Sequence, residues 1–259
     1  MTQESTNLTA SILTANLPPH IAYDAELFKP IPLGMGGYPY WPYAPQCGIS
    51  VLVAWMSWEL SPRIYLAVGN DGGAAAATRF IYDVHQCEGA ALVTWNGAKF
   101  DDALVEATAT KEWGAYWREG ILPRRRRVDL CVVAGVAEKS LSKSEVLYDS
   151  AMGQLAAGLH PKYPLLAGFQ SENAHVNVVT GWRLESAYAS TFGIDTAWCT
   201  LKAIHGADAP LAWHRGEVGT VIGYCLGDVV MLRELHLHAW EHGHLKSGDR
   251  VARLPRTVL

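Results

Sequence analysis

The sequence predicts an α/β fold in which helices flank a mixed five-stranded sheet. Short apolar segments typical of buried strands lie in the first half of the chain, and helical patterns alternate with them. The last hundred residues are mainly helical in pattern. Strands that come early, with helices interleaved, favour a layered α/β sheet over a helical bundle or a β-sandwich.

The expected strands are short and apolar, and they cover residues 20–23, 49–58, 64–68, 90–95 and 127–133. The turn at Ser61-Pro62 separates the second from the third. The expected helices cover residues 74–86, 100–111, 181–192 and about 218–242. Residues 29–48 are rich in proline, glycine and aromatic side chains and have no secondary-structure period, so we expect an ordered loop there.

Composition points to one globular domain with a substantial core. Hydrophobic residues make up 49% of the chain and it contains ten tryptophans, which excludes a disordered polypeptide. Neither a repeat nor a linker divides the sequence. We therefore expect a flexible arm over residues 1–17, a single domain over residues 18–245 and a C-terminal tail over residues 246–259.

Charge and cysteine content limit the partners and the compartment. The net charge is only −4, so contact with nucleic acid requires a local basic patch and metal ions. The five cysteines are scattered and none is spaced as CxxC. Without an apolar N-terminal signal segment, they indicate reduced thiols and a cytoplasmic protein. No apolar segment is long enough for a membrane-spanning helix.

The first acidic motif is Tyr23-Asp24-Ala25-Glu26, which follows the first expected strand. Residues two apart on a strand point to the same face, so Asp24 and Glu26 can share one metal ion. The D-x-E pattern is common by chance. Two solvated turn acids are an equally good interpretation of this motif alone.

The second motif runs from Trp95 to Asp101, where an apolar strand ends at Asn96-Gly97 and a helix begins. Loops at strand ends are where α/β sheets carry their sites. The Asn96 amide and the Phe100 ring are placed to hold a nucleotide, and Asp101 is placed to face a metal. The spacing disfavours the adjacent Asp102. The alternative is that Asp101 is a first-turn acid favoured by the helix dipole.

The third motif lies in the long C-terminal helix. Tyr224 and Asp228 are four residues apart and therefore share one helix face, where a phenol and a carboxylate can meet one ligand. Gly219, Gly223 and Gly227 form a second stripe that permits close approach to the helix backbone. A core tyrosine followed by a surface aspartate is the alternative.

Taken in order, the three motifs resemble those of the DEDD family of 3′–5′ exonucleases, in its tyrosine variant, within the DnaQ-like superfamily. The likeness is strongest to stand-alone exonucleases related to the proofreading domains of family B polymerases. It implies a ribonuclease H-like fold. It also implies that Asp24, Glu26, Asp101 and Asp228 hold two Mg²⁺ or Mn²⁺ ions, while Tyr224 positions the attacking water.

The resemblance covers roughly residues 20–240, and it includes a helix that ends in a glycine turn near residues 183–193. Two departures stand out: Leu27 replaces a threonine that is frequent in the family, and the loop over residues 28–48 is long. Side chains expected to contact nucleic acid lie beside the motifs, in this loop and in a run of four arginines. They are Leu27, Phe28, Trp41, Asn96, Gly97, Phe100, Arg124 and Arg125.

We expect the substrate to be the 3′ end of single-stranded DNA, because the likeness is to polymerase-type proofreaders. An exoribonuclease and a catalytically idle nucleic-acid-binding module of the same fold are the alternatives. A replication or repair protein is a candidate partner, and the sequence leaves the oligomeric state open. The segment from His238 to His242 also has the H-x-x-E-H spelling of a zinc protease, but no third ligand is evident, so a histidine-rich helix end is the favoured interpretation.

Overall fold

The computed structural model describes residues 17–31, 44–97, 100–113, 127–141, 144–147, 149, 182–194 and 204–259. Its strands are β1 (His20–Leu27), β2 (Ile49–Met56), β3 (Arg63–Leu66), β4 (Ala91–Thr94), β5 (Arg127–Asp129), β6 (His244–Ser247) and β7 (Arg250–Arg253). Its α-helices are α2 (Ala44–Cys47), α3 (Ala74–His85), α4 (Asp101–Trp113), α5 (Leu130–Leu141), α7 (Leu184–Phe192), α9 (Ala209–His214) and α10 (Val218–His242). Two short 3₁₀ helices, η5 (Gly206–Asp208) and η6 (Arg256–Val258), complete the described elements.

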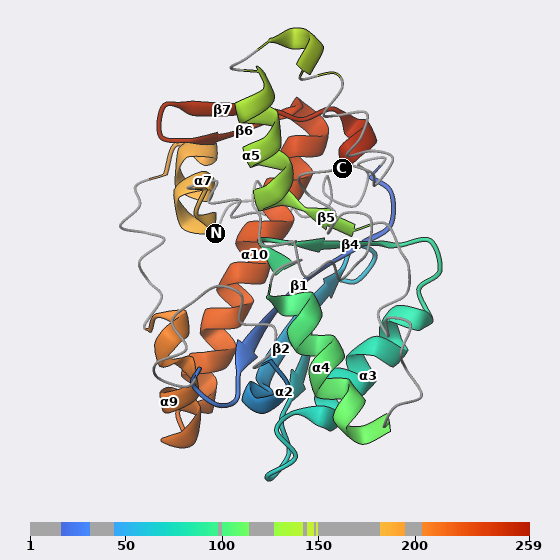
Figure 1. The fold of residues 1–259 in the computed structure, drawn as a ribbon, viewed down its shortest axis with the longest axis vertical. Coiled ribbons are helices and arrows are strands. Elements are labelled where there is room, and N and C mark those ends of the chain that lie inside the picture. The colour runs from blue at the N-terminus through green and yellow to red at the C-terminus, as the bar shows by residue number, and fades with distance from the viewer. Residues whose placement is uncertain are drawn as a thin grey trace, which may run out of the picture.

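A five-stranded mixed sheet in the order β3-β2-β1-β4-β5 forms the centre of the molecule (Figure 1). β1 and β2 pair antiparallel, as do β2 and β3, whereas β1 pairs parallel with β4 and β4 with β5. The predicted α/β class with a mixed five-stranded sheet is therefore confirmed. The expected strand and helix positions are also matched closely at β2, β3, β4, α3 and α10.

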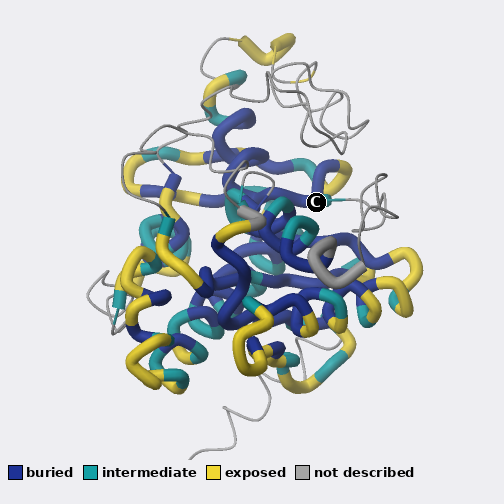
Figure 2. Tube along the Cα trace, turned by 60° about the horizontal axis from the view of Figure 1, so that its bottom comes forward, coloured by how far each residue is buried: buried dark blue, intermediate teal, exposed yellow. Residues whose placement is uncertain are grey.

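Each face of the sheet is covered by its own set of helices. One hydrophobic cluster joins Ala22, Val53 and Val93 to α5, α7, α9 and α10. The other joins residues such as Tyr23 and Leu52, which point the opposite way, to α3 and α4. Figure 2 shows this central region as a largely buried block. Successive side chains of a strand alternate between its two faces. Alternate residues of β1 therefore contact different sets of helices.

β1 is twice as long as the expected strand, since it runs for eight residues from His20 to Leu27. Asp24 and Glu26 therefore lie within the strand and not after it, as the sequence pattern had suggested. Both residues pair with β2, in register with Val53 and Val51. This pairing fixes the backbone of both acids in the middle of the sheet.

The expected strand over residues 127–133 is wrong beyond its third residue. β5 ends at Asp129, and α5 begins at Leu130. The Asp129 carboxylate accepts the backbone N–H of Val132 at 3.2 Å, which is the bond of a helix N-cap, and it also accepts the N–H of Asn96 at 2.8 Å. A buried run of β-branched residues fits either a strand or a buried helix, and here the cap selects the helix.

Residues 246–259, expected to form a separate tail, belong to the packed fold. After α10 the chain forms the β6–β7 hairpin, which packs against α5 and α7. Leu245, Ala252, Leu254, Val258 and Leu259 are all buried in the same hydrophobic cluster as α10. Arg250 also pairs with Glu138 of α5, with Nε and Oε1 2.6 Å apart.

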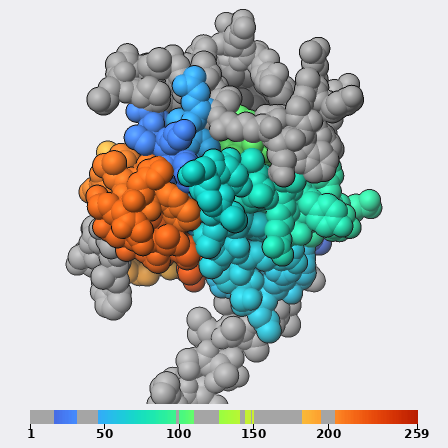
Figure 3. Space-filling model, turned by 90° about the horizontal axis from the view of Figure 1, so that it is seen from below, coloured from blue at the N-terminus to red at the C-terminus, as the bar shows by residue number. Residues whose placement is uncertain are grey.

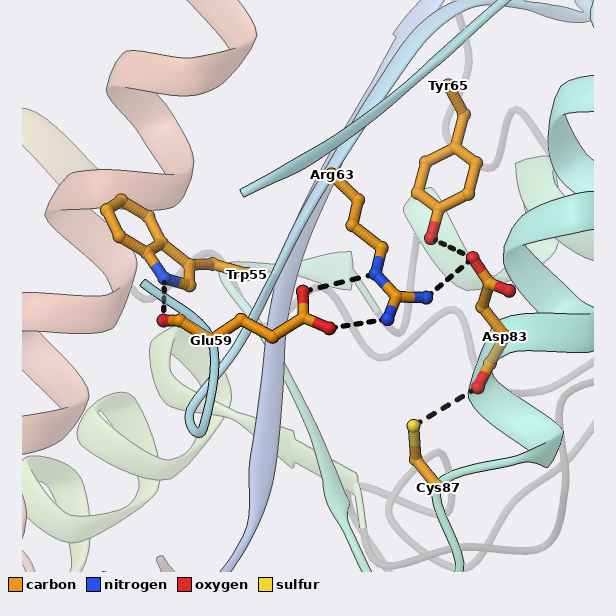
Figure 4. Close-up of polar contacts among 6 residues, drawn as sticks. All are labelled: Trp55, Glu59, Arg63, Tyr65, Asp83 and Cys87. Carbon is orange, nitrogen blue, oxygen red and sulfur yellow. Dashed lines mark hydrogen bonds and ion pairs between the residues drawn. The ribbon is translucent and has the colours of Figure 1, made fainter. Parts of the chain in front are cut away.

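A polar network fastens the β2–β3 hairpin to α3 (Figure 4). Arg63 pairs with Glu59 in the turn and, through Nη1, with the Asp83 carboxylate at 2.9 Å. The Tyr65 hydroxyl donates to the same carboxylate at 2.8 Å. These contacts fix the outer edge of the sheet against the helix. Among the described residues, no helix is long and apolar enough to cross a membrane.

Candidate active site

The two acids of β1 point toward α10. Ala22, two residues earlier on the same strand face, packs in the α10 cluster, while Tyr23 and Ala25 pack in the cluster on the other face. Glu26 is buried and Asp24 is half-buried. One ligand atom from each acid lies within 4.8 Å of the other and of the Cys225 sulfur. The shared face expected for the D-x-E motif is therefore present.

Asp101 reaches this pair because β1 extends beyond β4. The two strands pair only from His20 to Ala22, so the next part of β1 has no neighbouring strand on that side. The backbone N–H of Ala25 donates instead to Asp101 Oδ1 at 3.1 Å. Asp101 is the first residue of α4 and is 3% exposed. The start of α4 thus places a carboxylate between Asp24 and Glu26 along the strand.

Asp102, the next residue, binds different partners. Its carboxylate accepts the Tyr23 hydroxyl and pairs with Arg127 Nη1 at 2.9 Å. Arg127 also pairs with Glu106 at 3.2 Å. Asp102 therefore has a structural role on the α4 side of the sheet, where it pairs with Arg127.

α10 supplies the remaining members of the third motif. Tyr224 is half-buried and Asp228 is buried one turn further along the helix. Between them Cys225 donates its thiol to the backbone carbonyl of Asp24 at 3.3 Å. This contact joins residues 201 positions apart in the chain and fixes the helix against β1.

The electrostatics of the site are dominated by mutual repulsion. Burial raises the pKa of Glu26 well above its ordinary value, and Asp24, Asp228 and Asp101 raise it further. Glu26 and Asp24 also share a side-chain hydrogen bond, which requires one of them to hold a proton. Without a cation at the site, at least one of these acids is therefore protonated.

Asp101 shows the same behaviour. Burial raises the pKa of its carboxyl well above the ordinary value, and the charges of Asp24 and Asp102 add to this, against the lowering effect of the Ala25 N–H. Buried carboxylates need a positive partner or a metal ion to remain ionised. A cation bound here would therefore stabilise the ionised form of these acids.

The Tyr224 hydroxyl stays protonated in this environment. Burial raises its pKa, and so do Asp228, Glu26, Asp24 and Glu185 of α7. It is therefore a hydrogen-bond donor and not a base. Gly206 of η5 lies against it, since a Cβ at that position would stand 3.2 Å from the hydroxyl oxygen.

The donor set suits a hard divalent cation. Mg²⁺ and Mn²⁺ prefer carboxylate oxygens; Asp24 and Glu26 offer them within 4.8 Å of each other, and Asp101 and Asp228 act electrostatically on Glu26. Cys225 belongs to the same cluster, but burial and the charges of Asp24 and Glu26 raise the pKa of its thiol well above the ordinary value. A protonated thiol is a poor metal ligand, so the carboxylates would hold the metal.

The side chains expected to contact nucleic acid are placed less favourably. Leu27 lies on the opposite face of β1 from Glu26 and is buried in the core. Phe28 is buried too, with its ring 5.0 Å from His214 and 6.4 Å from Trp213 of α9. Figure 3 shows the end of β1 at the surface beside the segment that contains α9. Trp41, Arg124 and Arg125 lie outside the described residues.

The second motif has a clear structural role at its loop. Asn96 adopts a left-handed backbone, with φ of 64°, and its N–H binds the Asp129 carboxylate. Gly97 has no room for a side chain, because a Cβ would lie 2.4 Å from Thr94. Phe100 is half-buried and packs against the core on the α3 side. These residues shape the loop that presents Asp101.

Sequence reasoning did not single out Cys225, Glu185 or Gly206 as neighbours of the site. Cys225 lies within the third motif, one residue after Tyr224, so the helix periodicity could have predicted a buried thiol that faces β1. Gly206 and Glu185 carried no such signal. In comparisons with known proteins, no family model matches the chain and no curated protein is significantly similar to it.

Proposed function

We propose that this protein is a metal-dependent 3′–5′ exonuclease that removes nucleotides from single-stranded nucleic acid, with DNA as the first candidate substrate. The observation that carries the proposal is the Asp24–Glu26 pair, whose ligand atoms lie within 4.8 Å of each other, with Asp101 bonded to the intervening Ala25 N–H and with Asp101 and Asp228 both raising the pKa of Glu26. These acids come from three segments of the chain and from three different elements.

The fold agrees with this proposal. The resemblance to DEDD exonucleases implies a ribonuclease H-like sheet, and a mixed five-stranded sheet flanked by helices is compatible with it. The proposal also accounts for the different partners of the two neighbouring acids of α4: Asp101 accepts the Ala25 N–H between Asp24 and Glu26, whereas Asp102 accepts the Tyr23 hydroxyl. Sheets of this kind support many other activities, and the acids of the site are what favour this one.

The chemistry follows from the charges. Two divalent ions held by the four acids would activate a water molecule and stabilise the leaving 3′ oxygen. Asp24 and Glu26 would bind from β1, Asp101 from α4 and Asp228 from α10. The protonated hydroxyl of Tyr224 would donate a hydrogen bond that orients the attacking water, and Gly206 would keep that hydroxyl in place.

The test is metal-dependent hydrolysis of oligonucleotides of one sequence, made as DNA and as RNA and labelled at the 5′ end. With Mn²⁺, we expect a ladder of products that shorten by single nucleotides, with DNA cleaved faster. Faster cleavage of RNA would indicate an exoribonuclease. Binding without cleavage, by a protein whose melting temperature rises with Mn²⁺, would indicate an idle nucleic-acid-binding module.

A further inference from the structure

Three histidines meet at the C-terminal end of α10. His238 and His242 are one helical turn apart, and their ring centroids are 4.4 Å apart. Gly243 then adopts a left-handed conformation, with φ of 70°, and its N–H binds the Ala239 carbonyl at 2.8 Å. This turn ends the helix and starts β6, so that His244 comes back to His238 with ring centroids 5.1 Å apart.

Two of these rings present a nitrogen lone pair. His244 Nδ1 lies 3.1 Å from the backbone carbonyl oxygen of His242, and because a carbonyl only accepts, Nδ1 carries the proton and Nε2 the lone pair. His238 Nε2 is fully buried and has no hydrogen-bond partner among the described residues.

The surroundings limit what else this nitrogen can do. The ring of Phe192 meets His238 edge-on, with centroids 5.3 Å apart, and closes one side of the cluster. A hydrogen bond from a ring nitrogen to a backbone carbonyl, as in His244, is the usual support of a metal-ligating histidine. The Glu241 carboxylate lies 3.9 Å from His242 Nε2 and adds an oxygen donor at the rim.

We propose that His238, His242 and His244 form a binding site for a borderline transition-metal ion of the Zn²⁺, Co²⁺ or Ni²⁺ type. Imidazole nitrogens suit these ions, whereas Mg²⁺ requires oxygen ligands. The ring nitrogens of the three histidines do not all lie within 4.8 Å of one another, so coordination requires side-chain rotation, for which His242, at 56% exposure, has room.

This site is separate from the candidate active site and independent of its function. It lies at the end of α10 next to β6 (Figure 1), whereas Tyr224 and Asp228 lie nearer the start of the helix. The sequence spelling H-x-x-E-H belongs to this segment. The site requires no proteolytic chemistry, and its role would be to fasten β6 to the helix end.

The test is calorimetric titration of Zn²⁺ into the full-length protein at pH 7.5. Asp24→Asn and Asp228→Asn are introduced together as a background that removes competing carboxylates. We expect one Zn²⁺ per chain, bound roughly tenfold or more weakly after His242→Gln or His244→Gln. His85→Gln replaces an exposed histidine at the end of α3 and serves as the matched control, with unchanged affinity.

Co²⁺ provides a second measurement that reports the ligands directly. We expect visible d–d absorption typical of nitrogen coordination, lost after His242→Gln and retained after His85→Gln, with circular dichroism confirming that both variants are folded. The proposal is overturned if Zn²⁺ binds the two histidine variants as tightly as it binds the control. It is also overturned if binding disappears with the two aspartate substitutions alone.

Discussion

Asp101 and Asp102 are adjacent in the chain but serve opposite sides of β1. Asp101 accepts the N–H of Ala25 and faces the acids of the strand, whereas Asp102 accepts the Tyr23 hydroxyl and pairs with Arg127. Both residues are buried to a similar degree. They therefore form a matched pair in which the same substitution separates a role in the site from a role in folding.

Asp101→Asn should abolish cleavage and leave the fold intact. Loss of a metal ligand is expected to raise the barrier by at least about 3 kcal/mol, which is more than a hundredfold in rate. Because the mutation removes one negative charge from a repelling cluster, the melting temperature in chelator should rise. Rates of oligonucleotide cleavage and melting curves in chelator measure both effects.

Asp102→Asn should destabilise the fold and leave cleavage by the folded protein unchanged. The Tyr23 hydroxyl and Arg127 would lose their charged partner, and breaking a buried ion pair costs about 3 kcal/mol or more in unfolding free energy. Urea unfolding measures this loss, and cleavage per folded molecule should stay near that of the wild type. The two roles are assigned wrongly if Asp102→Asn is stable and inactive while Asp101→Asn is active.

Tyr224→Phe should lower the rate by roughly 10- to 1,000-fold, within the range for groups that position water or protons. The ring and its packing remain, so stability should not change. A loss of stability with normal activity per folded molecule would make Tyr224 only a core residue.

Gly206→Ala tests whether the position of the Tyr224 hydroxyl matters, because it adds a methyl group beside that hydroxyl. A methyl group 3.2 Å from the oxygen must displace it by a few tenths of an ångström, and we expect a roughly tenfold lower rate with near-normal stability, since misplaced catalytic groups lose much of their effect. Gly219→Ala is the matched control, because a Cβ there meets nothing within 4 Å. Equal rates in the two alanine variants would show that Gly206 does not position Tyr224.

The sequence predicted the architecture well where hydrophobic patterns were long. The helix expected over about residues 218–242 has the same bounds as α10, which runs for 25 residues from Val218 to His242. The shared face of Asp24 and Glu26 was predicted from the two-residue period of a strand, and the structure has it. Asp102 was set aside from Asp101 on spacing, and the two residues have different partners. These predictions concern which side chains point to the same face. The two-residue period of a strand and the 3.6-residue period of a helix determine that directly from the sequence.

Other features could not be predicted because they depend on tertiary contacts. The valine-rich segment after Asp129 had strand propensity, yet the carboxylate cap and burial against the sheet make it helical. The β6–β7 hairpin is a partial exception, because its two-residue Gly248-Asp249 loop, with Gly248 at a φ of 60°, is a hairpin turn signal present in the sequence. Only its packing on α5 and α7 depends on tertiary contacts. The approach of Gly206 to Tyr224 joins segments that no local pattern connects.

The stability of the protein should fall in acid because of His20. Burial lowers the pKa of this histidine to about 4 in the folded state, and its ring packs edge-on to that of His236 at 4.6 Å. In the unfolded chain the pKa is about 6.5. The unfolded state therefore binds a proton first, and stability is lost as pH falls from about 6.5 to about 4.

The loss attributable to His20 should approach about 3 kcal/mol at the acid end of this range. His20→Asn removes the titrating group, so its stability should vary less than that of the wild type between about pH 7 and about pH 4.5. Urea unfolding at both pH values measures the difference. Parallel curves for the two proteins would show that His20 does not carry the acid sensitivity; His85→Gln serves as a surface control.

Divalent ions should raise the melting temperature without any substrate. Ions that bind only the folded state stabilise it by mass action, by about 2.7 kcal/mol at a hundred times the dissociation constant. Mn²⁺ should act at lower concentration than Mg²⁺. Asp101→Asn should shrink the shift, and an identical shift in wild type and mutant would mean that the acids do not form one metal site.

The most direct measurement is the single-turnover rate of nucleotide release from a 5′-labelled single-stranded DNA in Mn²⁺, for the wild type and for Asp228→Asn. We predict stepwise shortening from the 3′ end by the wild type, no cleavage in chelator, and a rate at least about a hundredfold lower in the mutant. Circular dichroism ensures that both proteins are folded. A folded wild type that releases no nucleotide from DNA or RNA in Mn²⁺, or an Asp228→Asn variant with an undiminished rate, would contradict the proposed function.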